Sequence, residues 1–212
     1  AARSAFESTK QRFFGHLLTS MKTPTLIRSI EADLEAGHAA VIQIVSTGEA
    51  LMERRLSEIP TEEWNDISVD VTPREYVGSY LQHSFPVQLY EPFTDGEGNL
   101  SSRPVFRDGQ PVECREAVAR RDEMLEQLGS LPPVPGALDQ IVQRFGTDMV
   151  AEVTGRSRRI VRKGDGASTR LAVENRAPSA NLAETSAFMD DQKRVLVFSD
   201  AGGTGRSYHA EL

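Results

Sequence analysis

Residues 194–207, RVLVFSDAGGTGRS, decide how the chain folds. The apolar run from Val195 to Phe198 is short and ends at Ser199-Asp200, directly before a turn that contains three glycines. A run of this length and position predicts a fully buried strand of a parallel sheet. The glycine-rich turn predicts a loop that a phosphate or a nucleic-acid backbone can approach closely, because glycine has no side chain and its exposed N–H groups attract anions.

One interpretation of this turn is a nucleotide phosphate loop of the form G-x-x-x-x-G-K-[ST]. Its defined positions fall on Asp200, Gly205, Arg206 and Ser207. Two of them do not fit, since an Asp replaces the first glycine and an Arg replaces the compact lysine ammonium. The helix whose N-terminus should bind the phosphate also has no room in Tyr208 to Leu212. The sequence therefore disfavours an autonomous nucleotide site.

Two further apolar runs end in small polar residues. The run from Ala39 to Val45 ends in Ser46-Thr47-Gly48, before a helical stretch from Glu49 to Leu56. This pattern predicts a strand, a loop and a helix whose N-terminus suits a phosphate, with an ordinary helix cap as the alternative. The second run, Val150 to Val153, predicts a buried strand that ends at Thr154-Gly155-Arg156.

These residues resemble the C-terminal lobe of superfamily-two helicases, and most closely the strawberry-notch family with its bacterial and phage relatives. The resemblance is carried by Thr154-Gly155 at the end of one strand, Phe188 in the helix before the last strand, and Ser199-Asp200 with Gly205 in a loop that resembles motif V. The unit that begins at Ala39 resembles motif IV. The resemblance implies an α/β fold, a mostly parallel RecA-like sheet flanked by helices, with an inserted α+β segment.

The implied organisation is a single incomplete lobe over residues 1–212. Residues 1–57 supply helices and the motif IV unit, residues 58–111 form the insertion, and residues 112–212 complete the lobe as far as motif V. At Lys22-Thr23-Pro24 the pattern predicts that one helix ends and another begins, because Pro suits the first helical position. The basic run after Arg156 predicts a short β-ribbon that returns over Arg170 to Val173.

The resemblance also implies a function, ATP-driven movement along nucleic acid by a larger enzyme of which this chain is an inactive fragment. ATP and Mg would bind in the full-length enzyme, between this lobe and the first lobe of the same polypeptide, and we expect neither on this chain alone. The implied nucleotide-binding residues are Asp200, Gly203, Gly205, Arg206 and Ser207. The residues expected to face a DNA or RNA backbone are Ser46, Thr47, Thr154, Gly155, Arg156 and Ser199. Ser207 stands where many relatives have an Asp that would accept a hydrogen bond from a ribose hydroxyl, and no catalytic or metal-binding residue is expected.

Composition limits these expectations. The chain has 212 residues and a net charge of −7, which argues against strong autonomous binding to nucleic acid. The exception is one local basic cluster: Arg156, Arg158, Arg159, Arg162 and Lys163. An alternative interpretation of its arginines is a solvated strand edge that charge protects against pairing. No apolar run has membrane-spanning length, so we expect a cytoplasmic protein. The competing class is a non-catalytic protein- or nucleic-acid-interaction module with a RecA-like sheet.

Overall fold

The structure is a computed structural model that describes residues 2–67, 72–132, 134–164 and 168–200. These residues divide into two compact units, which we describe separately. The larger unit comprises Phe14–Pro73 and Pro133–Leu212, and the smaller one comprises Ala1–Phe13 and Arg74–Pro132. The first helix, α1 (Ala2–Glu35), contributes residues to both.

The larger unit is built on a parallel sheet of three strands in the order β1-β9-β6. These strands are β1 (Ala40–Ile44), β6 (Val150–Val153) and β9 (Val195–Ser199). The central strand β9 has Val195, Leu196 and Val197 at 0% exposure, which confirms the buried strand predicted from its apolar run.

Helices cover both faces of this sheet. On one face, Ile30 of α1 and Ile141 of α5 (Ala137–Phe145) belong to the same buried cluster as Val195 and Val197. On the other face, Phe188 of α6 (Ala180–Met189) packs against Leu196 and its neighbours on β6. Alternate residues of β9 therefore serve two cores, and the predicted α/β fold with a parallel sheet flanked by helices is confirmed.

The remaining elements of the larger unit lie beside this sheet. They are α2 (Glu49–Leu56), the 3₁₀ helix η1 (Thr61–Asn65), β7 (Arg158–Lys163) and β8 (Arg170–Asn175). β7 and β8 form an antiparallel hairpin, as the basic run predicted. Ile160 of β7 shares a buried cluster with Met52 and Leu56 of α2, against which Trp64 of η1 also packs.

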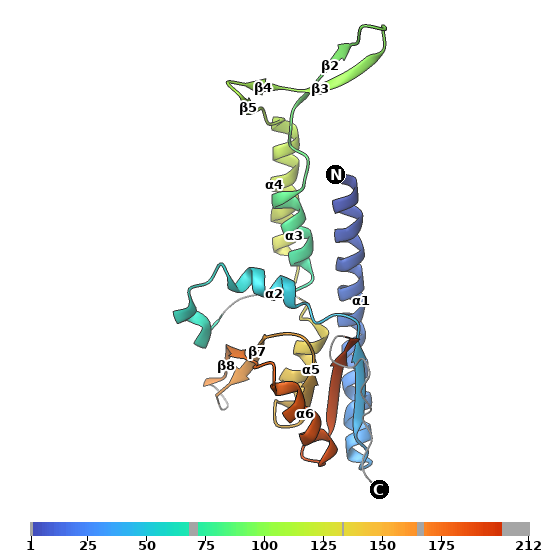
Figure 1. The fold of residues 1–212 in the computed structure, drawn as a ribbon, viewed down its shortest axis with the longest axis vertical. Helices are drawn as coiled ribbons and strands as arrows, with labels where there is room; N and C mark the ends of the chain where they lie inside the picture. Colours follow the sequence, from blue (N-terminus) through green and yellow to red (C-terminus); the bar gives the residue numbers. More distant parts are fainter. Residues whose placement is uncertain (1, 68–71, 133, 165–167, 201–212) are drawn as a thin grey trace. The chain divides into compact units, whose positions relative to one another are not determined.

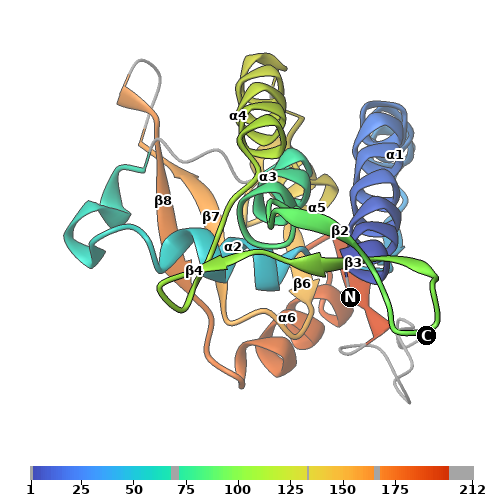
Figure 2. The ribbon, with the colours of Figure 1, turned by 90° about the horizontal axis from the view of Figure 1, so that it is seen from above.

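The smaller unit consists of a helix pair and two short hairpins. α3 (Arg74–His83) packs beside α4 (Arg115–Ser130), as Figures 1 and 2 both show. The hairpins pair β2 (Tyr90–Thr94) with β3 (Leu100–Pro104), and β4 (Phe106–Arg107) with β5 (Gln110–Pro111). The insertion expected at residues 58–111 overlaps this unit from residue 74 onward.

The predicted break at Lys22-Thr23-Pro24 is wrong, since α1 continues through Pro24. Proline has no N–H to donate to the carbonyl four residues earlier, which here belongs to Ser20. Gln140 of α5 donates its side-chain amide to that same carbonyl at 3.4 Å. A tertiary contact therefore satisfies the group that Pro24 leaves without its helical partner, and the local signal for a helix end is overridden.

Candidate nucleic-acid interface at the carboxyl edge of the sheet

The three parallel strands end together at one edge of the sheet. Ile44 of β1 is in register with Ser199 of β9, and Val153 of β6 is in register with Phe198. The loops that follow β1 and β6, with Ser46-Thr47 and Thr154-Gly155, therefore leave the same edge as Asp200. Ligands of open α/β sheets bind outside the carboxyl ends of the strands. The structure thus brings the sequence-predicted nucleic-acid residues to one edge, although they are far apart in the chain.

Their exposure divides these residues into two groups. Ser46 and Gly155 are exposed and Thr47 is half-buried. In contrast, Thr154 and Arg156 are each 2% exposed and Ser199 is 5% exposed. The sequence placed the Arg156 side chain at the nucleic acid, whereas the structure places it inside the protein, because acidic side chains bind its guanidinium there.

The loop after β1 is held by its own hydroxyl groups. Ser46 Oγ accepts a hydrogen bond from the N–H of Gly48 at 3.3 Å, and Thr47 Oγ1 accepts one from the N–H of Glu49 at 3.4 Å. The N-cap of α2 is Gly48, whose φ of 71° lies in the left-handed region that favours glycine. Ser46 and Thr47 therefore organise the turn into α2 without being the cap residue itself.

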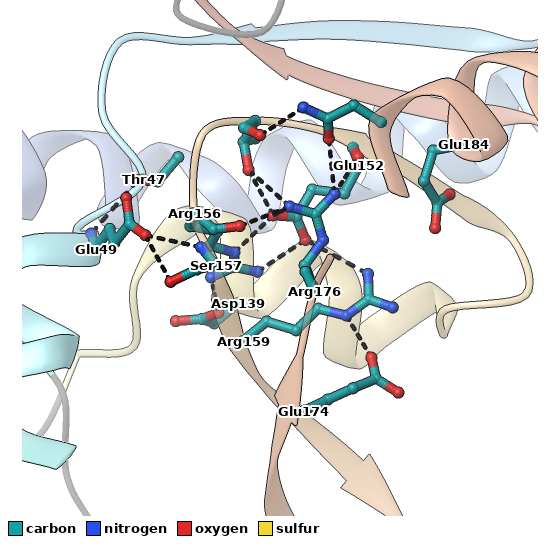
Figure 3. A network of polar contacts seen from close by, with 12 residues as sticks. Thr47, Glu49, Asp139, Glu152, Arg156, Ser157, Arg159, Glu174, Arg176 and Glu184 are labelled. Carbon is teal, nitrogen blue, oxygen red and sulfur yellow. Dashed lines mark hydrogen bonds and ion pairs between the residues drawn. The ribbon is translucent and has the colours of Figure 1, made fainter. Parts of the chain in front are cut away.

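Glu49 joins this loop to the loop after β6 (Figure 3). One carboxylate oxygen, Oε1, accepts hydrogen bonds from the main-chain N–H of Ser157 at 2.7 Å and from its hydroxyl at 3.3 Å. A carboxylate that accepts two hydrogen bonds at once is a strong, charge-assisted anchor. Glu49 thus fixes the spacing between the two exposed loops of the edge.

Behind the edge lies a set of charged side chains, of which Glu152 and the three arginines are buried and the two other acids are half-buried. We call it the arginine network: Asp139, Glu152, Arg156, Arg159, Glu174 and Arg176. Its centre is Glu152 of β6, which is 0% exposed. Arg156 donates Nε to Glu152 Oε1 at 2.6 Å and Nη2 to Oε2 at 3.0 Å, a bidentate pair. Arg156 also donates Nη1 to Asp139 Oδ1 of α5 at 2.8 Å.

Arg176 ties the chain after β8 to the end of β6 (Figure 3). It donates to the carbonyl oxygens of Glu152 at 2.6 Å and Arg156 at 2.9 Å. Asn181 of α6 accepts from Arg176 at 3.0 Å and donates to the carbonyl of Thr154 at 2.8 Å. The main chain from Glu152 to Arg156 is therefore held by side chains from two other segments, which keeps Gly155 at a fixed place on the edge.

The network also sets the protonation of its central carboxyl group. Burial raises the pKa of Glu152. This effect is outweighed by the charge and hydrogen bonds of Arg156, the charge of Arg176 and a hydrogen bond from Thr154, all of which lower the pKa. The result is a pKa lowered from its ordinary 4.5 to about 2. Burial alone would lower the pKa of Arg156, and Asp139 and Glu152 raise it above its ordinary value. Both groups are therefore charged at neutral pH.

Sequence reasoning missed this network, although one signal for it was present. Glu152 interrupts the apolar run Val150 to Val153, and a charged residue within a fully buried strand needs a paired cation. Arg156 follows four residues later and supplies it. The predicted basic cluster accordingly divides into buried, paired arginines and outward-facing cations.

Most of the predicted nucleotide-binding residues lie outside the described residues: Gly203, Gly205, Arg206 and Ser207. Asp200 is described and exposed, and its Oδ1 accepts a hydrogen bond from Gln43 Nε2 of β1 at 2.7 Å. Within the described ranges, no group of three or more His, Cys, Asp or Glu side chains is arranged to hold a metal ion. Among these same residues, no helix combines the length and apolar character that a membrane span requires.

Comparison with known proteins shows what the chain is similar to. Residues 136–212 match a helicase C-terminal family described as "C-terminal domain on Strawberry notch homologue". The chain is 24% identical to protein strawberry notch homolog 1 of Rattus norvegicus, in an alignment that covers 97% of this chain and 21% of the relative. It is 34% identical to protein strawberry notch of Drosophila melanogaster (53% of this chain, 7% of the relative) and 35% identical to protein strawberry notch homolog 2 of Mus musculus (56% and 9%).

The chain therefore spans about a fifth or less of these curated relatives. No solved structure matches it. The family resemblance recognised from the sequence is confirmed, and so is its assignment to a helicase C-terminal domain.

Proposed function

We propose that the chain, whose residues 136–212 match a helicase C-terminal domain of strawberry notch homologues, is part of the second RecA-like lobe of an ATP-dependent DNA helicase or translocase. In this proposal the carboxyl edge of the sheet contacts the nucleic-acid backbone. ATP and Mg bind in the longer protein, in a cleft between this lobe and the first lobe, with Asp200 and the residues that follow it at the cleft. The chain alone is inactive, because a nucleoside triphosphatase also needs a phosphate loop and a metal-binding carboxylate.

The observation that carries the proposal is the convergence of the exposed loops at one sheet edge. The Ser46 hydroxyl and the exposed main chain at Gly155 are neutral hydrogen-bonding groups, which suit phosphate contacts that do not depend on base sequence. Glycine at position 155 leaves the main chain open to close approach. Opening and closing of the interlobe cleft during ATP hydrolysis would then move this edge relative to the first lobe.

The arginine network has a supporting part in this proposal. Arg156 is a positioning residue, since it holds the main chain next to Gly155 through Glu152 and Asp139 rather than by touching the ligand. Glu49 is also a positioning residue, because it fixes the spacing of the two loops through its hydrogen bond with Ser157. A rigid edge matters because backbone contacts act only when their geometry is fixed in advance.

The experiment places a negative charge on the edge of the longer protein that carries this lobe. Ser46→Glu should repel phosphate and reduce DNA-stimulated ATP hydrolysis at least tenfold, with the basal rate unchanged. The matched control is Gln192→Glu, the same change in charge at an exposed residue in the turn that leads to the amino end of β9. DNA stimulation in Ser46→Glu equal to that of the control would overturn the edge assignment. A longer protein that hydrolyses no ATP with or without DNA would instead select the non-catalytic interaction module.

A further inference from the structure

The far end of the β7–β8 hairpin carries three exposed cations, which we call the basic tip: Arg162, Lys163 and Arg170. The rest of the hairpin is anchored, since Ile160 and Val161 are each 4% exposed and Ala172 is 1% exposed. Burial ends at Val161, and the three cations project beyond it. The tip is therefore a charged projection on a firmly packed base.

The register places two of these charges directly opposite each other. Lys163 pairs with Arg170 across the hairpin, and Arg162 pairs with Leu171. Like charges at directly opposed positions of an antiparallel pair destabilise it. Within the part of the chain that the structure describes, none of the three cations has an ion pair or a hydrogen-bonded acid. An unfavourable pair without a counter-charge is stabilised when an external anion binds.

The neighbouring arginines of the same run are different, because each has an acidic partner. Arg158 pairs with Glu53, and Arg159 donates to Glu174 at 2.6 Å. Even with Asp165, which lies outside the described residues, the segment from Arg162 to Arg170 has three basic residues and one acidic residue, a net charge of +2 in a chain of −7. The unpaired positive charge is thus concentrated at the tip.

We propose that the basic tip is a second nucleic-acid contact, which binds the phosphate backbone by charge. This inference rests on the proposed function and extends it beyond the carboxyl edge. Lys163 and Arg170 are opposed, about 5 Å apart, and project from the same face of the ribbon, whereas Arg162 projects from the other face because successive side chains alternate. A phosphate backbone that passes the end of the ribbon can therefore contact all three long side chains. The segment has no aromatic side chain on which a base would stack, so the contact is ionic and independent of base sequence.

The test compares two triple variants of the chain, each of which changes the net charge from −7 to −10. The tip variant is Arg162→Gln, Lys163→Gln and Arg170→Gln. The control variant changes three exposed cations of α1: Arg12→Gln, Lys22→Gln and Arg28→Gln. Binding to a fluorescein-labelled oligothymidylate and to a duplex is measured by anisotropy from about 20 to 200 mM KCl, a range over which counterion release is resolved.

The unchanged chain should bind in the range of non-specific contacts, with a Kd of about 10⁻⁴ to 10⁻⁶ M. The tip variant should bind at least tenfold more weakly at the lowest salt. Its slope of log K against log salt should fall by about 2 on single strands and by more on the duplex, because each lost phosphate contact removes about 0.7 or 0.9. The control should keep the slope of the unchanged chain.

Trp64 emission provides the folding check, since Trp64 packs in the same cluster as Ile160, Leu171 and Val173 of the hairpin. If the folded tip variant has the slope and affinity of the control, the tip proposal is overturned while the edge proposal stands. If the unchanged chain binds neither ligand at the lowest salt, both are overturned. Polyglutamate serves as a third probe. If the tip variant loses binding to polyglutamate but keeps its binding to DNA, the tip proposal is also overturned, and the result indicates an acidic protein segment as the ligand.

Discussion

Replacement of Arg156 by Met tests the arginine network directly. The guanidinium makes two hydrogen bonds to Glu152 and one to Asp139, and Glu152 is 0% exposed. Removing one partner of a buried ion pair costs about 3–5 kcal/mol, because the remaining charge stays buried without compensation. Thr154 still donates to Glu152 at 2.7 Å, and Arg159 and Arg176 each lie 3.5 Å from its carboxylate. These remaining partners place the expected loss at the lower end, about 3 kcal/mol.

The lowered pKa of Glu152 leads independently to a similar magnitude. A shift from 4.5 to about 2 corresponds to roughly 3 kcal/mol of unfolding free energy. Because the folded pKa is depressed, this contribution is fully present above the unfolded pKa and is lost as the pH falls toward 2. About 2 kcal/mol of it should be lost by pH 3. The difference in stability between the wild-type chain and Arg156→Met should therefore be largest at pH 7 and shrink as the pH is lowered to 3.

The assay is urea unfolding followed by Trp64 fluorescence, since Trp64 is the single tryptophan and lies in the same unit as the network. Arg144→Met is the matched control, because Arg144 pairs with Glu31 and its side chain is 57% exposed. Exposed ion pairs contribute at most about 1 kcal/mol, so the control should lose little and show no special acid dependence. Equal losses for the two variants at pH 7, or a gap that does not change between pH 7 and pH 3, would refute the reasoning.

Two further predictions concern neighbouring contacts. Glu49→Ala removes the acceptor of the Ser157 N–H, so hydrogen exchange at that amide should become at least tenfold faster, and an unchanged rate would show that Glu49 does not hold the loop. Arg158→Ala removes a guanidinium that lies 5.1 Å from the Trp64 ring centroid and pairs with Glu53. Both partners of that ion pair are about one-third exposed, so we expect a loss of only about 1 kcal/mol together with a shift of the Trp64 emission maximum. An emission spectrum identical to that of the wild-type chain would contradict the stacking.

The strands and their carboxyl edge were predictable from the sequence because burial on both faces imposes a continuous apolar run. Val195 to Phe198 and Ala39 to Val45 contain few polar interruptions, and each ends in small polar residues. The run from Ala39 is the less buried of the two, since β1 lies at the side of the sheet and exposes Val41. Parallel pairing then follows from the helices between the strands, and it brings Ser46, Gly155 and Ser199 to one edge.

The continuity of the first helix through Thr23-Pro24 was not predictable from local sequence. Thr23-Pro24 is a good helix start by its own chemistry, yet Thr23 donates its hydroxyl to the carbonyl of Thr19 at 2.8 Å and lies within one long helix. The deciding group is Gln140, which is more than a hundred residues away. Propensity is a local quantity, and a distant side chain that satisfies a freed carbonyl is invisible to it.

The same limitation explains why the basic run had two interpretations. Five cations between Arg156 and Lys163 look equivalent in sequence, and only the placement of acids from other elements separates them. Asp139 of α5, Glu53 of α2 and Glu174 of β8 each bind one arginine of the run. An arginine already bound to a buried carboxylate has to break that pair before it can bind a phosphate, whereas an exposed cation opposite another cation gains from an anion. The distribution of acids therefore leaves Arg162 and Lys163, with Arg170, as the exposed cations that our proposal assigns to a phosphate backbone, whereas Arg156 holds the edge from within the protein.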